Sequence, residues 1–154
     1  MNSRFNFKDV LPEGYKALSV GQQFVNNSSV DKVLLELVKL RASQLNGCVF
    51  CLDMHLTDAK KMGFSDQRLF TLTAWHESPF FTEKEKAVLA LTDALTLLAE
   101  EGLDDEIYDE VRAHFDEEET ATLMTAICMI NTWNRLMVAT QAPPASLSKS
   151  RSGN

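Results

Sequence analysis

A helical repeat of apolar residues runs through almost the whole chain and constrains its fold more than any other feature. The repeat is clearest between residues 30 and 46, where apolar side chains recur every three or four positions: Val30, Val33, Leu34, Leu37, Val38 and Leu45. This spacing places them on one face of an α-helix. No stretch of the sequence shows the alternation of apolar and polar residues that is typical of a half-buried β-strand. The sequence therefore predicts an all-α fold in which each helix turns an apolar stripe towards a shared core.

Prolines, glycines and capping residues predict where the helices begin and end. Pro12 suits the first turn of a helix, while Gly47 and Gly63 suit the positions just after helix ends. Thr82 and Glu85 have the spacing of a capping box, which marks a helix start. The predicted helices cover residues 12–26, 30–46, 48–62, 66–74, 83–100, 104–114 and about 116–139.

Length, composition and charge bound the kind of protein. The 154 residues suit one domain, and we expect an N-terminal arm (1–11), a helical bundle (12–140) and a flexible C-terminal tail (141–154). The net charge of −7 argues against nucleic-acid binding and against attraction to anionic membranes. No apolar run approaches the ~18 residues that span a bilayer, and the first residues have no signal-peptide core. We therefore expect a cytoplasmic protein.

Two of the three cysteines form a Cys-x-x-Cys pair, Cys48 and Cys51, followed by His55. On a helix that turns about 100° per residue, the three side chains share one face. The thiolate is the reactive form of cysteine, and a helix N-terminus, where Cys48 is expected, favours that form. An imidazole one turn further on can carry a proton to or from a thiol or a leaving oxygen. The pattern favours a thiol redox pair.

Two alternatives remain open from the residues alone. The cysteines could be structural thiols, or they could form part of a zinc site together with His55. A structural zinc needs four ligands, and the fourth would have to be Cys128, His76, His114 or a carboxylate.

Polar and aromatic residues near the pair are further candidates. Glu36 lies at the flank of the apolar stripe, from which a carboxylate can point into a cleft; the alternative is a solvated side chain. Arg41 and Gln44 fall within the stripe, and a buried Arg needs a carboxylate partner, so we interpret both as structural or subunit-contact residues. Phe50 and Met54 are expected to face away from the two cysteines, towards another helix or subunit.

The last predicted helix is apolar nearly all round over residues 121–130, and should lie centrally. We expect Cys128 to be a buried small side chain and Trp133 to pack in the core. Asn131 and Asn134 suit packing and capping roles on the same helix.

The order of Glu36, eleven residues, Cys48, two residues, Cys51, three residues and His55 resembles the AhpD-like alkylhydroperoxidase branch of the carboxymuconolactone decarboxylase superfamily. The resemblance continues through residues 74–85, 87–98 and 130–135. It implies an all-α subunit that assembles as a homotrimer or homohexamer. No flavin, haem or nucleotide motif is visible, so we expect no cofactor.

The resemblance also implies a peroxidase cycle. Cys51 matches the thiol that attacks a hydroperoxide, and Cys48 matches the thiol that resolves the sulfenic acid to a disulfide. A dithiol or a thiol protein would then reduce the disulfide, while Glu36 and His55 would relay protons. If the acidity of the thiol alone decided which cysteine attacks, Cys48 at the helix start would be the attacking thiol. We follow the resemblance and assign this role to Cys51.

One position departs from that pattern: the family's alkylhydroperoxidase has a second His just before the attacking Cys, where this chain has Phe50. The proton relay is therefore shorter. Two other functions remain open. One is a lactone or decarboxylase enzyme of the superfamily's other branch, which needs acid–base groups but not two thiols. The other is a non-enzymatic redox or metal-responsive module.

Overall fold

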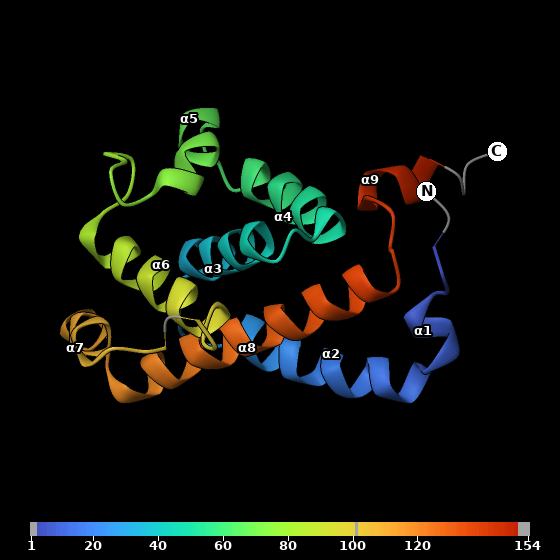
Figure 1. The fold of residues 1–154 in the computed structure, drawn as a ribbon, viewed down its shortest axis with the longest axis horizontal. Helices are drawn as coiled ribbons and strands as arrows, with labels where there is room; N and C mark the ends of the chain where they lie inside the picture. Colours follow the sequence, from blue (N-terminus) through green and yellow to red (C-terminus); the bar gives the residue numbers. More distant parts are fainter. Residues whose placement is uncertain (1–2, 101, 151–154) are drawn as a thin grey trace.

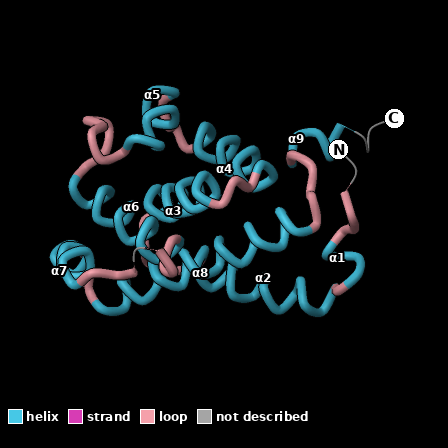
Figure 2. Tube along the Cα trace, in the orientation of Figure 1, coloured by secondary structure: helices cyan, strands magenta, loops and turns pink. Residues whose placement is uncertain are grey.

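The structure, a computed structural model, describes residues 3–100 and 102–150 (Figure 1). These residues form nine α-helices and one short 3-10 helix, with no β-strand among them (Figure 2), so the all-α prediction is confirmed. The helices are α1 (Phe7–Val10), α2 (Pro12–Asn26), α3 (Lys32–Leu45), α4 (Val49–Lys61), α5 (Asp66–Phe70), η1 (Thr71–Ala74), α6 (Glu83–Thr96), α7 (Asp105–His114), α8 (Glu117–Ala139) and α9 (Ala145–Ser150). No helix in the described ranges is long and apolar enough to cross a membrane.

Helix α3 lies at the centre of the bundle, where it packs against α4, α6 and α8 (Figure 1). Its side chains contribute to two apolar clusters. Leu34, Leu35 and Val38 pack with α6 and α8, while Leu37 and Leu40 pack with α4, α5, η1 and α6. Since α3 is covered on several sides, most of its central residues are buried, the polar residue Glu36 included.

The predicted helix ends agree with the structure where capping chemistry marks them. Helix α2 spans the predicted residues, and the Thr82–Glu85 capping box opens α6. Gly47 and Gly63 both adopt positive φ after helix ends. Two extents were wrong: the predicted helix 66–74 is split into α5 and η1, and α6 ends four residues early because Leu97 leaves helical geometry.

Both ends of the described chain are more structured than an extended arm and a flexible tail. Asn6 caps the short helix α1, and the backbone N–H of Arg4 donates to the carbonyl of Thr140. Near the other end, Asp53 of α4 accepts hydrogen bonds from the backbone and side chain of Ser146 in α9. Residues 1–2 and 151–154 lie outside the described residues, and the division at residues 11 and 140 stays a prediction.

Candidate active site

Two consecutive turns hold the Cys-x-x-Cys pair in place. At the end of α3, the N–H of Gly47 donates to the carbonyl of Gln44 and the N–H of Cys48 donates to that of Ser43. This is a Schellman motif, and Gly47 takes the left-handed conformation that it requires (φ 63°). The same Cys48 is the N-cap of α4, where its sulfur accepts the backbone N–H of Cys51 at 3.4 Å. Short-range sequence chemistry thus fixes the first cysteine between two helices.

Cys48 and Cys51 form a disulfide with their Cα atoms 5.4 Å apart. Each cysteine is only 1% exposed. Two cysteines three residues apart at a helix start are therefore close enough to be oxidised and reduced with little movement of the backbone.

A buried carboxylate lies directly behind the imidazole. Nδ1 of His55 is 2.8 Å from Oε1 of Glu36, and Nζ of Lys39 is 2.6 Å from Oε2 of the same side chain. Glu36 is 3% exposed and His55 is 7% exposed. The structure thus brings together all four residues that the sequence analysis selected, and adds Lys39.

The charge state of Glu36 follows from these contacts. Burial by itself raises the pKa of Glu36, but the hydrogen bond and charge of His55, together with Lys39, outweigh burial and leave this pKa below the ordinary carboxyl value. At neutral pH Glu36 is therefore an ionised acceptor, and the Nδ1–H group of His55 donates to it. In a neutral imidazole this assignment leaves Nε2 as the free, proton-accepting nitrogen.

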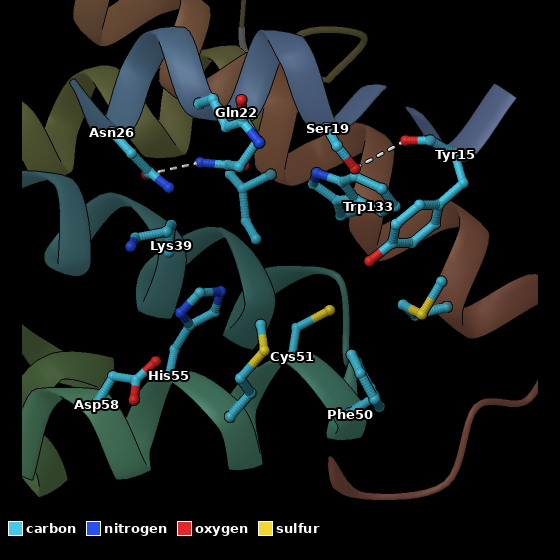
Figure 3. A pocket seen from close by; sticks show the side chains of 14 residues that line it. Tyr15, Ser19, Gln22, Asn26, Lys39, Phe50, Cys51, His55, Asp58 and Trp133 are labelled. Carbon is cyan, nitrogen blue, oxygen red and sulfur yellow. Dashed lines mark hydrogen bonds between the residues drawn. The ribbon is translucent and has the colours of Figure 1, made fainter. Parts of the chain in front are cut away.

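A cavity of about 450 Å³ lies over this group, between α2, α4 and α8 (Figure 3). Cys51 and His55 point into it from α4, and Lys39 reaches it from α3 (Figure 3). Glu36 is not among the residues that line it. The opposite wall comes from uncharged polar side chains of α2: Tyr15, Ser19, Gln22, Gln23 and Asn26. The rest of the lining consists of the carboxylate Asp58 of α4 and five apolar side chains, Phe50, Met54, Ile130, Trp133 and Met137. We refer to this space as the first cavity.

Two interpretations of aromatic and sulfur side chains were wrong in this region. Phe50 and Met54 do not face away from the reactive pair but line the first cavity beside it. The face of α4 that lines the cavity carries residues 50, 51, 54, 55 and 58. A helical wheel that takes Cys48 as the middle of the reactive face therefore places Phe50 and Met54 on the wrong side of the helix. Trp133 also lines the cavity, with its ring 5.3 Å from that of Tyr15, instead of packing wholly in the core.

The prediction for Cys128 was also wrong, because this free cysteine is exposed. Helix α8 buries Leu123, Ala126 and Ile127 against the core, and Cys128 lies beside this stripe on an uncovered face. An apolar helix sequence does not reveal which of its faces a single subunit leaves open.

Arg41 has the carboxylate partner that its place in the apolar stripe requires. Its guanidinium donates to both carboxylate oxygens of Asp93 at 2.7 Å, and the indole N–H of Trp75 donates to Asp93 at 3.1 Å. Within the described chain Oε1 of Gln44 is buried without a hydrogen-bond partner. The structural role of Arg41 is therefore supported by these contacts, and that of Gln44 stays a prediction.

The asparagines of α8 hold this helix against α3 and α6. Asn46, after α3, donates to both Asn131 and Asn134 at 3.0 Å. Asn134 in turn donates to Ser43, and Asn131 donates to Thr96. This network fixes the helix that carries one wall of the cavity, as expected for packing residues.

Lys39 and the polar face of α2 were missed by the sequence analysis, although each left a signal. Lys39 follows Glu36 by three residues, the spacing of a helical ion pair. The five polar residues of α2 recur at spacings of four, three, one and three, so they share one helix face. Among the described residues, no group of three or more His, Cys, Asp or Glu side chains is arranged to hold a metal ion.

Comparisons with known proteins agree with this geometry. Residues 12–94 match the carboxymuconolactone decarboxylase family. The chain is 42% identical over 139 residues to the uncharacterized protein YdfG of Bacillus subtilis strain 168, covering 90% of this chain and 95% of YdfG.

Solved structures share the same arrangement of helices. A protein of unknown function from Agrobacterium tumefaciens, for which a role as the antioxidant defence protein AhpD has been suggested, superposes with a TM-score of 0.90 at 39% identity, over 93% of this chain and 98% of that one. The debrominase Bmp8 superposes with a TM-score of 0.78 at 19% identity, over 90% and 75% of the two chains. At that identity the likeness concerns the fold alone.

Proposed function

The chain belongs to the carboxymuconolactone decarboxylase family, and we propose that it works as an AhpD-like thiol peroxidase that reduces hydroperoxides through a Cys48–Cys51 dithiol–disulfide cycle. The observation that carries the proposal is the first cavity, into which both Cys51 and His55 open. Nucleophilic catalysis requires a thiol and a base that reach the same bound substrate. A buried carboxylate that orients the base completes this arrangement.

The oxidative half of the cycle begins from the reduced dithiol. Nε2 of His55 accepts the proton of Cys51, and the resulting thiolate attacks one oxygen of the hydroperoxide. The O–O bond breaks, the sulfur becomes a sulfenic acid, and the leaving alkoxide takes the proton back from His55 to depart as an alcohol. Glu36 stabilises the protonated imidazole during this step, since its charge is already in place.

Cys48 completes the oxidation. Its thiolate attacks the sulfur of the sulfenic acid on Cys51, the S–O bond breaks, and the disulfide forms. The leaving hydroxide takes up the proton that the Cys48 thiol gave up and departs as water. The sum of the steps converts one hydroperoxide and two thiols to one alcohol, one water and one disulfide. Reduction by an external dithiol then restores the two thiols.

The position before Cys51 limits the relay to one imidazole. Phe50 supplies an apolar side chain to the cavity wall, and His55 is the one imidazole among the residues that line the first cavity. We propose that the enzyme is a homotrimer or homohexamer and that it acts in the cytoplasm. Thiol reductants there keep cysteines reduced and would regenerate the dithiol after each cycle.

The test is consumption of cumene hydroperoxide with dithiothreitol as the reductant. Cys51→Ser should abolish turnover, while Cys128→Ser, which removes the exposed thiol, should retain it. Mass spectrometry of the peroxide-treated wild type should locate a Cys48–Cys51 disulfide. Turnover that survives in Cys51→Ser would overturn the proposal.

A further inference from the structure

A second, smaller cavity of about 250 Å³ lies on the other side of the reactive pair. It is bounded by the start of α4 and the end of α8, and its lining residues are Gly47, Cys48, Val49, Phe50, Met137, Val138, Gln141 and Ala142. We refer to it as the second cavity. Cys48 lines this cavity and not the first, whereas Cys51 lines the first and not the second.

The partition between the two cavities is made by two side chains. Phe50 and Met137 line both spaces, so they lie between the side of the pair that faces His55 and the side that faces the end of α8. The two cysteines of one disulfide are therefore presented to separate spaces.

Turns with fixed backbone geometry frame the second cavity on both sides. The Schellman motif at Gly47 ends α3, and a second one ends α8, where the N–H of Ala142 donates to Met137 and that of Gln141 donates to Val138. Gln141 occupies the left-handed position of this motif (φ 55°) without being glycine. The second cavity is thus bounded on both sides by backbone of constrained geometry.

From this arrangement we propose that the second cavity is the access route of the reductant, and that the reductant attacks Cys48; this inference rests on the proposed dithiol–disulfide cycle. Among the described residues, no charged side chain lines the second cavity, and Gln141 is the only amide side chain in its lining. It therefore suits an uncharged dithiol on a slender apolar chain. Peroxide and reductant would reach the pair from opposite sides.

The chemistry of exchange favours this direction of attack. A reductant thiolate bonds to the sulfur of Cys48, the Cys48–Cys51 bond breaks, and Cys51 leaves as a thiolate. That thiolate is released into the first cavity beside His55, ready for the next hydroperoxide. The second thiol of the reductant, once deprotonated, then attacks the reductant's own sulfur in the mixed disulfide. Cys48 leaves as a thiolate and the reductant departs as its disulfide, so the pair gains two electrons. The two protons that the reductant thiols released on deprotonation balance the two cysteine thiolates and restore the dithiol.

The test measures the two half-reactions separately in a Cys128→Ser background. Val138 and Val49 line only the second cavity and are each 48% exposed, so both positions have room for a larger ring on the solvent side. Val138→Trp, with Val49→Phe as an independent variant, should slow reduction of the disulfide by dithiothreitol about tenfold, because the added ring must be displaced. Oxidation of the reduced protein by cumene hydroperoxide should stay within about twofold of the parent.

Two control variants test whether the effect on reduction is specific to the second cavity. Ser19→Phe narrows only the first cavity and should slow oxidation more than reduction. Val20→Trp adds a ring at an exposed position of α2 outside both cavities and should change neither rate. Reduction at the parent rate in both Val138→Trp and Val49→Phe, or an equal loss in both half-reactions, would overturn the inference.

A single-thiol experiment identifies the attacked sulfur. Cys51→Ser/Cys128→Ser retains Cys48 alone, and Cys48→Ser/Cys128→Ser retains Cys51 alone. With hydroxyethyl disulfide as the probe, adding Val138→Trp should slow mixed-disulfide formation at Cys48 and not at Cys51. Slowing at Cys51 alone would overturn the assignment. Neither reduction nor this reaction needs a hydroperoxide, so both can succeed where the peroxidase proposal fails.

Discussion

Nδ1 of His55 lies 2.8 Å from Oε1 of Glu36, in a contact that is almost wholly withdrawn from solvent. The two residues belong to different helices, α4 and α3, and are 19 positions apart in the sequence. Because the carboxylate is ionised and can only accept, it selects the imidazole tautomer whose free nitrogen can take a proton from Cys51.

Replacing Glu36 by glutamine should therefore reduce the rate at which hydroperoxide oxidises the dithiol. Glutamine retains the size of the side chain but removes the charge that orients and stabilises the imidazolium. We expect a loss of about a hundredfold in the single-turnover rate, within the range for general acid–base catalysis. Stopped-flow measurement of thiol loss would give this rate.

Glu110→Gln is the matched control for that variant. Glu110 also pairs with a histidine, His114 at 3.2 Å, but on the surface of α7. The Glu110→Gln variant should oxidise its dithiol with hydroperoxide at the wild-type rate. An equal loss in both variants would show that the Glu36–His55 contact has no special role.

The lowered pKa of Glu36 also predicts how stability changes with pH. A carboxyl whose pKa is lower in the folded state than its ordinary value of 4.5 contributes stability above that value, and this contribution is lost as pH falls through the lower folded pKa. The difference in free energy of unfolding between wild type and Glu36→Gln should therefore be largest at neutral pH and shrink as pH falls below about 4.5. Urea denaturation of both proteins from pH 7 to pH 3 measures this difference; a gap that stays constant or widens in acid contradicts it.

Much of the fold follows from local sequence chemistry. Helix α2 begins at Pro12 because proline suits the first turn, and α6 begins after Thr82 because the capping box satisfies its free N–H groups. The Cys48, Cys51 and His55 group could be predicted because one short helix segment carries it.

Features that depend on tertiary packing could not be predicted in the same way. Tyr15 of α2 and Trp133 of α8 are more than 100 positions apart in the sequence, yet their rings are in contact beside the cavity. No local spacing in the sequence predicts that contact. Cys128 is exposed because no other part of the described chain covers that face of α8, although its neighbours in sequence are apolar. Phe50 was misplaced because the face of α4 that meets the cavity depends on where α2 and α8 lie.

Gly47 should be difficult to replace because of its backbone conformation alone. Its φ of 63° is in the left-handed region, and a Cβ added there would meet nothing within 4 Å. Gly47→Ala should therefore lower the free energy of unfolding by about 1 kcal/mol through strain without a steric clash. Gly47→Asn should lose less, since asparagine tolerates this conformation better. Urea denaturation distinguishes the two, and equal losses in both variants would refute the conformational explanation.

The mostly buried ion pair between Arg41 and Asp93 gives a final prediction about stability. Asp93 accepts two hydrogen bonds from Arg41 and one from Trp75, so Asp93→Ala leaves a mostly buried guanidinium and an indole N–H without a partner. We expect a loss of about 3 kcal/mol in the free energy of unfolding. The double variant Arg41→Met/Asp93→Leu should recover much of it, because it removes both charges together.

The exposed pair Lys60–Asp66, at 3.1 Å with both side chains 60% accessible, supplies the comparison. Lys60→Ala should cost less than about 0.5 kcal/mol, because solvent screens an exposed pair. Chemical denaturation of the three variants at neutral pH measures these costs. If Asp93→Ala proved as mild as Lys60→Ala, the ion pair would not be what holds α3, η1 and α6 together around Arg41.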